Sequence, residues 1–205
     1  VRLRLSMRGR AGWPLLGLYL AVVGAATVVC AGRHSGSETP RYAVPAPRPG
    51  VRENFAALSA GAVLRVSSYD WLHSHHPLYA IDGLVKPLEV EKWASSDRDR
   101  APWMEILPAV RVDVDRVDLD LAGAFEGADL TMREFVLRCL RDEGSVVKVI
   151  AERAVHDNTD ARPRLPLRCP GTDRLRIEFL VEGKSRPRGV VRLYEVAVWG
   201  VPTAP

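Results

Sequence analysis

A tryptophan and several histidines lie in one short stretch of the chain and have the chemistry of a sugar site. Trp71, His73 and His75 fall between Asp70 and Pro77. An exposed indole ring stacks on the apolar face of a pyranose, and imidazole nitrogens form hydrogen bonds with its hydroxyl groups. We therefore predict that these three side chains bind carbohydrate. A tryptophan that plugs one end of the fold, or an apolar projection for membrane or protein docking, would use the same residues.

The histidines also raise the question of zinc. The cluster reads His73-Ser74-His75-His76. A zinc site needs three or four ligands in tetrahedral geometry with hydrogen-bonding groups that orient them, and no matching cysteine or histidine set lies nearby. We therefore interpret this stretch as a polar loop.

No catalytic motif is present in the 205 residues. The sequence lacks a Gly-x-Ser-x-Gly turn, a phosphate-binding loop, a dinucleotide fingerprint and a His-Glu-x-x-His pair. Acidic residues between 113 and 120 alternate with apolar ones, which is typical of a solvated sheet face. The net charge is +4, but the arginines are spread along the chain rather than gathered on one stripe. We predict a binding protein that is not an enzyme and does not bind nucleic acid.

Alternating apolar residues predict an all-β domain from about residue 54 onward. Over 174–182 apolar and charged residues alternate, which places one face of a strand in the core. The same alternation over 135–139, a turn at 142–145 and a partner strand over 146–151 predict a hairpin. Short strands separated by turns favour a sandwich or a barrel.

One strand is predicted to be irregular. The apolar positions between Val112 and Leu121 change from even to odd numbers. A bulge or a strand break near Asp115 and Arg116 would account for this change.

Two cysteines lie in the predicted β domain, Cys139 and Cys169. An exported domain meets an oxidising compartment, and a disulfide forms only where the two α-carbons come within about 7 Å. Because Cys139 has the inward parity of its strand, two free buried thiols are the alternative.

The N-terminal residues 1–32 predict a membrane anchor or a signal peptide. Arg8 and Arg10 precede an uncharged run over 11–32, which just reaches the ~20 residues that span a bilayer. Arginines on the near side favour a cytoplasmic N-terminus and a folded domain outside the cytoplasm. Cleavage after Ala31 would instead release a secreted or periplasmic domain.

The rest of the chain divides into a linker and a domain. Residues 33–52 are rich in proline, glycine and serine and favour an extended tether. Residues 53–201 form the predicted β domain. A lipoprotein signal at Cys30 is a weaker reading of the first segment, because Val29 precedes the cysteine where a small residue is normal.

A series of short fragments after residue 60 carries a family resemblance. In order they are Ser67-Ser68-Tyr69, Ala80-Ile81-Asp82-Gly83, Trp93-Ala94-Ser95-Ser96, Pro102-Trp103-Met104-Glu105-Ile106, Val117-Asp118-Leu119-Asp120-Leu121, Leu175-Arg176-Ile177 and Leu193-Tyr194-Glu195-Val196-Ala197-Val198-Trp199-Gly200. This order resembles the discoidin domains of the coagulation-factor C-terminal type, within the galactose-binding-like β-sandwiches. The resemblance implies a jelly-roll-like sandwich of two antiparallel sheets with Trp93 and Trp103 in its core. It also implies a binding surface on the loops at one end, including the loop with Trp71.

The same resemblance implies a structural calcium ion. Its carboxylate ligands would be Asp82, in the turn after the first strand, and Glu195, in the closing strand. Calcium takes six to eight oxygen ligands, several of them often backbone carbonyls. This sequence departs from the family after Gly83, where Leu84, Val85 and an insert over 86–91 replace the usual acid or amide. Glu89 and Glu91 of this insert are candidate replacements, although neither sits at the matching place. The alternative is that Asp82 caps its own turn and that Glu195 pairs with an arginine.

Together these expectations describe a membrane-tethered, non-catalytic module that binds carbohydrate on the extracytoplasmic side. Two other functions stay open: a protein–protein adaptor in an envelope complex, and an accessory domain of a separate glycan-active enzyme. Fold-level analogy does not by itself separate them.

Overall fold

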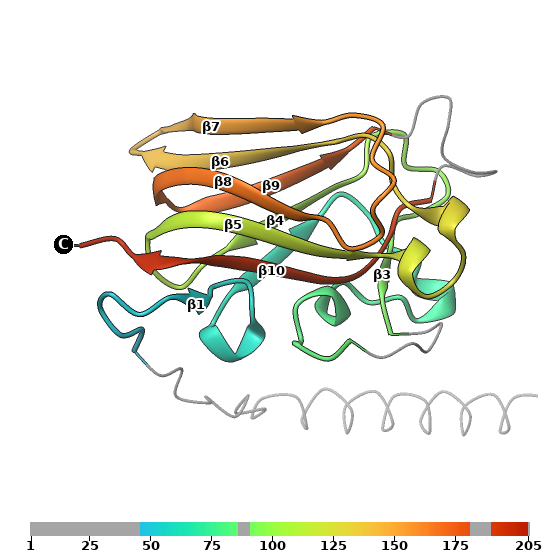
Figure 1. The fold of residues 1–205 in the computed structure, drawn as a ribbon, viewed down its shortest axis with the longest axis horizontal. Coiled ribbons are helices and arrows are strands. Elements are labelled where there is room, and N and C mark those ends of the chain that lie inside the picture. The colour runs from blue at the N-terminus through green and yellow to red at the C-terminus, as the bar shows by residue number, and fades with distance from the viewer. Residues whose placement is uncertain (1–45, 86–90, 181–189, 205) are drawn as a thin grey trace, which may run out of the picture. The chain divides into compact units, whose positions relative to one another are not determined.

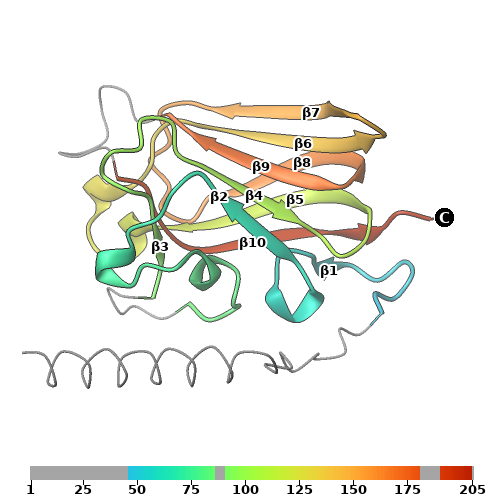
Figure 2. The same ribbon diagram turned by 180° about the vertical axis from the view of Figure 1, so that it is seen from behind.

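The computed structural model describes residues 46–85, 91–180 and 190–204. They form two facing antiparallel β-sheets, which Figures 1 and 2 show from opposite sides. The first sheet contains β1 (Glu53–Asn54), β10 (Arg192–Pro202), β5 (Val112–Leu121) and β8 (Arg164–Thr172), with β3 (Trp93–Ala94) also paired to β10. The second sheet has the order β2 (Val63–Val66), β4 (Trp103–Leu107), β9 (Arg174–Phe179), β6 (Phe135–Glu143) and β7 (Val146–Val155). The predicted all-β sandwich is confirmed.

The described residues contain 3-10 helices but no α-helix. These short helices lie in the loops and are η1 (Leu58–Ala60), η2 (Trp71–His73), η3 (Pro77–Ala80), η4 (Ala122–Ala124) and η5 (Ala128–Leu130). In the described part of the chain no helix is long and apolar enough to cross a membrane. The predicted membrane segment over 11–32 lies outside the described residues.

The core fills the space between the sheets. In β9 the apolar residues Leu175, Ile177 and Phe179 are all at most 2% exposed, so the predicted alternation is confirmed. Burial of such a side chain stabilises a fold by about 1.5–3 kcal/mol. Trp93 is fully buried and lies 5.8 Å from the Phe179 ring, between ring centroids. Trp103 is not in the core: it is half-buried, and the guanidinium of Arg176 lies 4.2 Å from its ring.

The irregularity predicted in β5 is a β-bulge. Arg116 pairs with Trp199 of β10, and Val114 pairs with the next residue, Gly200, so Asp115 is the extra residue. Asp115 turns its carboxylate to Arg52, whose guanidinium donates hydrogen bonds of 2.6 and 2.8 Å. The strand therefore continues from Val112 to Leu121 although its apolar positions change parity.

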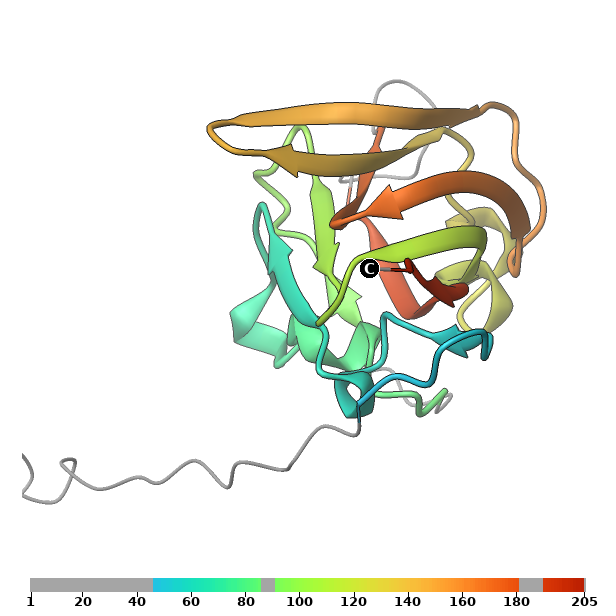
Figure 3. The ribbon, with the colours of Figure 1, turned by 90° about the vertical axis from the view of Figure 1, so that its left-hand side faces the viewer.

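The predicted hairpin is formed by β6 and β7, which lie along one margin of the sandwich (Figure 3). Its turn is Gly144–Ser145, and Gly144 adopts a φ of 67° that favours glycine. Cys139 of β6 is bonded to Cys169 of β8, with the α-carbons 6.1 Å apart. The disulfide links the two sheets, and the alternative of two free thiols is wrong.

Candidate functional site

The residues predicted to bind sugar lie together at the end of the sandwich marked by β3 in Figure 1. Trp71 and His73 belong to η2, and His75 follows it. Trp71 is 70% exposed, so it does not plug the end of the fold. These side chains line a pocket of about 650 Å³, which is within the size range of small-molecule sites.

The pocket is also lined by residues that the sequence did not predict. Arg98 comes from the loop after β3, and Arg192 begins β10. The two meet because β3 pairs with the start of β10, where Ala94 faces Arg192. Only this pairing between distant segments places both guanidiniums at the site, and no local pattern in the sequence predicts it.

Hydrogen bonds fix the loop that carries the pocket. The Trp93 indole N–H donates to the Ser68 carbonyl over 2.9 Å, and the Asp70 N–H donates to the Ala94 carbonyl over 2.9 Å. The hydroxyls of Ser67 and Ser68 both donate to the carboxylate of Asp99. Burial alone would raise the pKa of Asp99, but these hydroxyl bonds outweigh it and hold the pKa below its usual value.

His73 is oriented by a carboxylate. Its Nδ1 lies 2.7 Å from Oδ2 of Asp70, and its ring stacks near that of His75 with centroids 6.0 Å apart. Burial would raise the pKa of Asp70, but the hydrogen bond from His73 and the charges of both histidines lower it overall. An Nδ1–H bonded to Asp70 leaves Nε2 available to a ligand hydroxyl.

The formal charges of the described residues that line the pocket cancel, with two aspartates and two arginines. Asp70 is bonded to His73, and Arg192 forms a 2.7 Å ion pair with Glu126 behind the pocket wall. In the described part of the chain, the neighbours Asp97 and Arg98 form no ion pair with other residues, and they carry opposite charges. Such a lining fits a neutral polyhydroxylated ligand better than a strongly anionic one.

The two predicted calcium ligands are brought together. Glu195 of β10 is 8% exposed, and neither of its carboxylate oxygens has a hydrogen-bond partner among the described residues. Burial is the main cause that raises its pKa to about 8, and the negative charge of Asp82 adds to it. The nearby Gly83 N–H opposes this shift without forming a well-aligned hydrogen bond.

The alternative to calcium is right for Asp82 and wrong for Glu195 in the described part of the chain. Oδ1 of Asp82 accepts a 2.8 Å hydrogen bond from the Leu84 N–H, so this residue does cap its own turn. Glu195 forms no ion pair with an arginine in the described ranges. A buried carboxylate without partners beside a second carboxylate fits a divalent cation.

The described residues do not complete a larger set of ligands. Among them, no three histidine, cysteine, aspartate or glutamate side chains gather where they could hold a metal. Glu91 is among the residues searched and does not join Asp82 and Glu195 in such a group, whereas Glu89 lies outside the described residues. Within the described residues, further ligands to a cation between Asp82 and Glu195 would be oxygens of other kinds, such as backbone carbonyls.

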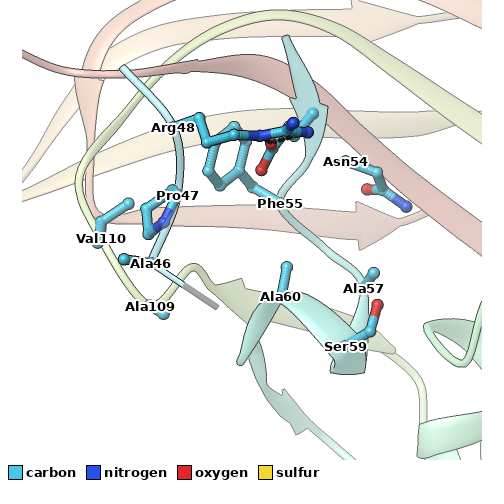
Figure 4. A pocket seen from close by; sticks show the side chains of 11 residues that line it. Ala46, Pro47, Arg48, Asn54, Phe55, Ala57, Ser59, Ala60, Ala109 and Val110 are labelled. Carbon is cyan, nitrogen blue, oxygen red and sulfur yellow. Dashed lines mark hydrogen bonds and ion pairs between the residues drawn. The ribbon is translucent and has the colours of Figure 1, made fainter. Parts of the chain in front are cut away.

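A second hollow of about 420 Å³ lies beside β1 (Figure 4). Its lining is mostly small and apolar, including Pro47, Phe55, Ala60 and Val110. Arg48 reaches over it and forms a 3.2 Å ion pair with Glu53. The aromatic ring in its lining, Phe55, is buried, and Arg48 and Glu53 are paired with each other, so it is the weaker candidate site.

Comparisons with known proteins identify the fold. No family model matches the sequence, and no curated protein matches it. Among solved structures, the family 32 carbohydrate-binding module from Streptococcus pneumoniae EndoD matches with a TM-score of 0.58 and 18% identity, over 72% of this chain and 99% of that one.

Two further structures agree. A fucose-binding module of S. pneumoniae, SpX-3, gives a TM-score of 0.53 at 17% identity, over 71% of this chain and 96% of that one. The family 32 module of C. perfringens NanJ, in complex with galactose, gives 0.54 at 12%, over 73% and 99%. The discoidin group in particular is not distinguished by these matches. The described domain therefore has the same fold as these modules, an antiparallel two-sheet β-sandwich.

Proposed function

We propose that the domain is a non-catalytic module that binds a neutral glycan in the pocket of Trp71, His73 and His75. The observation that carries this proposal is the 70% exposed indole of Trp71 at the mouth of a 650 Å³ pocket. The likeness in fold to modules described as binding fucose or galactose supports it. Stacking on an indole is a common way for a protein to hold a sugar ring.

Each group at the pocket has a role in this proposal. Trp71 supplies the stacking surface, while His73 and His75 form hydrogen bonds with sugar hydroxyls. Arg98 and Arg192 add N–H donors that suit ring and hydroxyl oxygens. Because the lining charges nearly cancel, we expect neutral sugars to bind better than uronic acids or sulfated sugars.

A glycan array with the unit Val44–Pro205, which contains the whole described core, tests this function. We expect binding to neutral glycans that Trp71→Ala removes. Val147→Ala, which trims an exposed side chain of β7, is the control and should bind like the parent protein. An array without signal at high protein concentration would count against the proposal.

We further propose that Asp82 and Glu195 hold a structural Ca²⁺ ion. A bound ion would neutralise the two carboxylates and join the turn after η3 to the closing strand. A ligand that binds only the native state raises the melting temperature. We expect calcium to raise it relative to chelator, and Glu195→Gln to abolish the difference.

The chain is also proposed to be membrane-tethered, with its domain outside the cytoplasm. The apolar run over 11–32 and the Cys139–Cys169 disulfide support this location, since disulfides persist in oxidising compartments. Fractionation of the full chain with an alkaline wash, followed by protease treatment of intact cells, tests it. A chain recovered in the cytosol with free thiols would contradict it.

One observation favours a second function, that of an adaptor in an envelope complex. Val146, Val147 and Val149 of β7 are 48–61% exposed, and within the described residues β7 pairs only with β6. An apolar sheet edge is a common place for another chain to bind. Copurification of a membrane protein that Val147→Lys abolishes, with sugar binding unchanged, would establish this role.

A further inference from the structure

We propose that Glu126, which does not line the sugar pocket, positions Arg192 for ligand binding. This inference rests on the proposed carbohydrate site. Glu126 follows η4, whose residues are far in sequence from the loop of Trp71. Among the described residues bonded to Glu126, Arg192 is the one that lines the pocket.

Glu126 is the centre of a compact network. Its Oε2 accepts a 2.7 Å hydrogen bond from Nη1 of Arg192. Its Oε1 lies 2.8 Å from Nζ of Lys92 and accepts a 3.1 Å hydrogen bond from the Tyr194 hydroxyl. The Glu126 side chain is 12% exposed, and that of Lys92 only 3%. One carboxylate is thus fixed on both oxygens by three donors.

Of the three donors to Glu126, Arg192 is the one that lines the pocket. Lys92 lies behind Glu126, where its ammonium is 5.4 Å from the centre of the Tyr194 ring. Arg192 lies in front, is 36% exposed and lines the pocket. Since Nη1 is bonded to Glu126, the guanidinium is held in one orientation and its other N–H groups stay available to a ligand.

A fixed donor binds a ligand more tightly than a mobile one, because the entropy of ordering the side chain has already been lost before binding. The buried ammonium of Lys92 restrains the carboxylate of Glu126. This carboxylate in turn restrains the guanidinium of Arg192. The arrangement resembles the pairing of Asp70 with His73, which also line the pocket. Each of these two ligand-facing side chains is therefore held by a carboxylate.

A double-mutant cycle tests this role, with fucose and galactose as the titrated sugars. We expect Glu126→Gln to weaken the binding of the better sugar about tenfold, the size of one charge-assisted hydrogen bond. In the Arg192→Ala background the same substitution should change Kd by less than about twofold. Equal losses in both backgrounds would show a merely structural role and overturn the proposal.

A second variant shows whether a loss of sugar affinity comes from misfolding. Glu126→Gln leaves the Lys92 ammonium buried without its partner, which is costly. Lys92→Met combined with Glu126→Gln removes both charges and should restore the fold while the tenfold loss of affinity remains. Recovery of full affinity in this double variant would also contradict the proposal.

A measurement without sugar separates this inference from the proposed function. In a ¹⁵N NMR spectrum of the parent protein at low temperature, the Nη1–H₂ group of Arg192, which donates to Glu126, should give a distinct, slowly exchanging signal that Glu126→Gln removes. If the signal is protected but the protein binds neither sugar, the proposed ligands are contradicted while the restraint of Arg192 by Glu126 stands. An averaged signal in the parent protein would overturn the restraint itself.

Discussion

At the scale of single residues, Glu195 is the most unusual side chain in the domain. Sequence resemblance pointed to it and to Asp82, and both residues are close enough for the charge of one to raise the pKa of the other. Its two buried oxygens without partners could not be predicted, because they depend on how β10 packs against the turn after η3. Such a carboxylate makes stability depend on pH.

We predict that, in chelator, the free energy of unfolding falls as pH rises from about 4.5 to about 8. The folded state keeps a proton on Glu195 up to a pKa of about 8, whereas the unfolded state loses it near the ordinary value of 4.5. The folded state therefore binds more protons in this window, and stability decreases by at most about 1.4 kcal/mol per pH unit. Urea unfolding at pH 5 and pH 8 measures the slope.

Two controls identify Glu195 as the cause. Glu195→Gln should flatten the slope, and saturating calcium should flatten it in the parent protein because the ion stabilises the charged carboxylate. A slope that persists unchanged in Glu195→Gln would assign the effect to another group.

At the scale of elements, the disulfide joins two strands that belong to different sheets. Cys139 lies in the second sheet and Cys169 in the first, at a sequence separation of 30. The period-two pattern predicted that Cys139 faces inward. The pattern did not decide whether the two cysteines form a disulfide or stay as free thiols, because the packing of the sheets sets the distance between them.

Replacement of both cysteines by alanine should lower the free energy of unfolding by about 3–4 kcal/mol, as expected for closure of a loop of this length. Sugar affinity should not change, since neither cysteine lines the pocket. Denaturant unfolding under oxidising conditions, with Val147→Ala as the surface control, measures the loss. A loss below about 1 kcal/mol would show that the bridge adds little to the packing around it.

The bulge in β5 makes a second prediction at this scale. Opposite the bulge, a Cβ on Gly200 would collide with the backbone carbonyl of Asp113. Gly200→Ala should therefore destabilise the domain by about 1–3 kcal/mol, because backbone must move to admit the methyl group. Val201→Ala, a half-exposed neighbour in the same strand, should cost much less when both variants are compared by thermal unfolding.

At the scale of the whole molecule, alternation and turn residues predicted an all-β sandwich or barrel, and the family resemblance added the arrangement in two sheets. They also gave the β6–β7 hairpin and the irregularity in β5. The pocket was only half predictable, because Trp71 and His73 are neighbours in sequence while Arg98 and Arg192 meet through the β3–β10 pairing. Glu126 was missed for the same reason: its partners Lys92, Arg192 and Tyr194 come from segments far from it in sequence.

The most direct test of the central claim is an NMR titration of the indole N–H signals with a neutral sugar such as galactose or fucose. The sequence has five tryptophans, and those in the described domain are Trp71, Trp93, Trp103 and Trp199. We predict a saturable shift of the Trp71 signal, while Trp103 and Trp199 outside the pocket stay unchanged. Indole signals that do not move with any neutral sugar, or that move only at Trp103 or Trp199, would contradict a glycan site at Trp71.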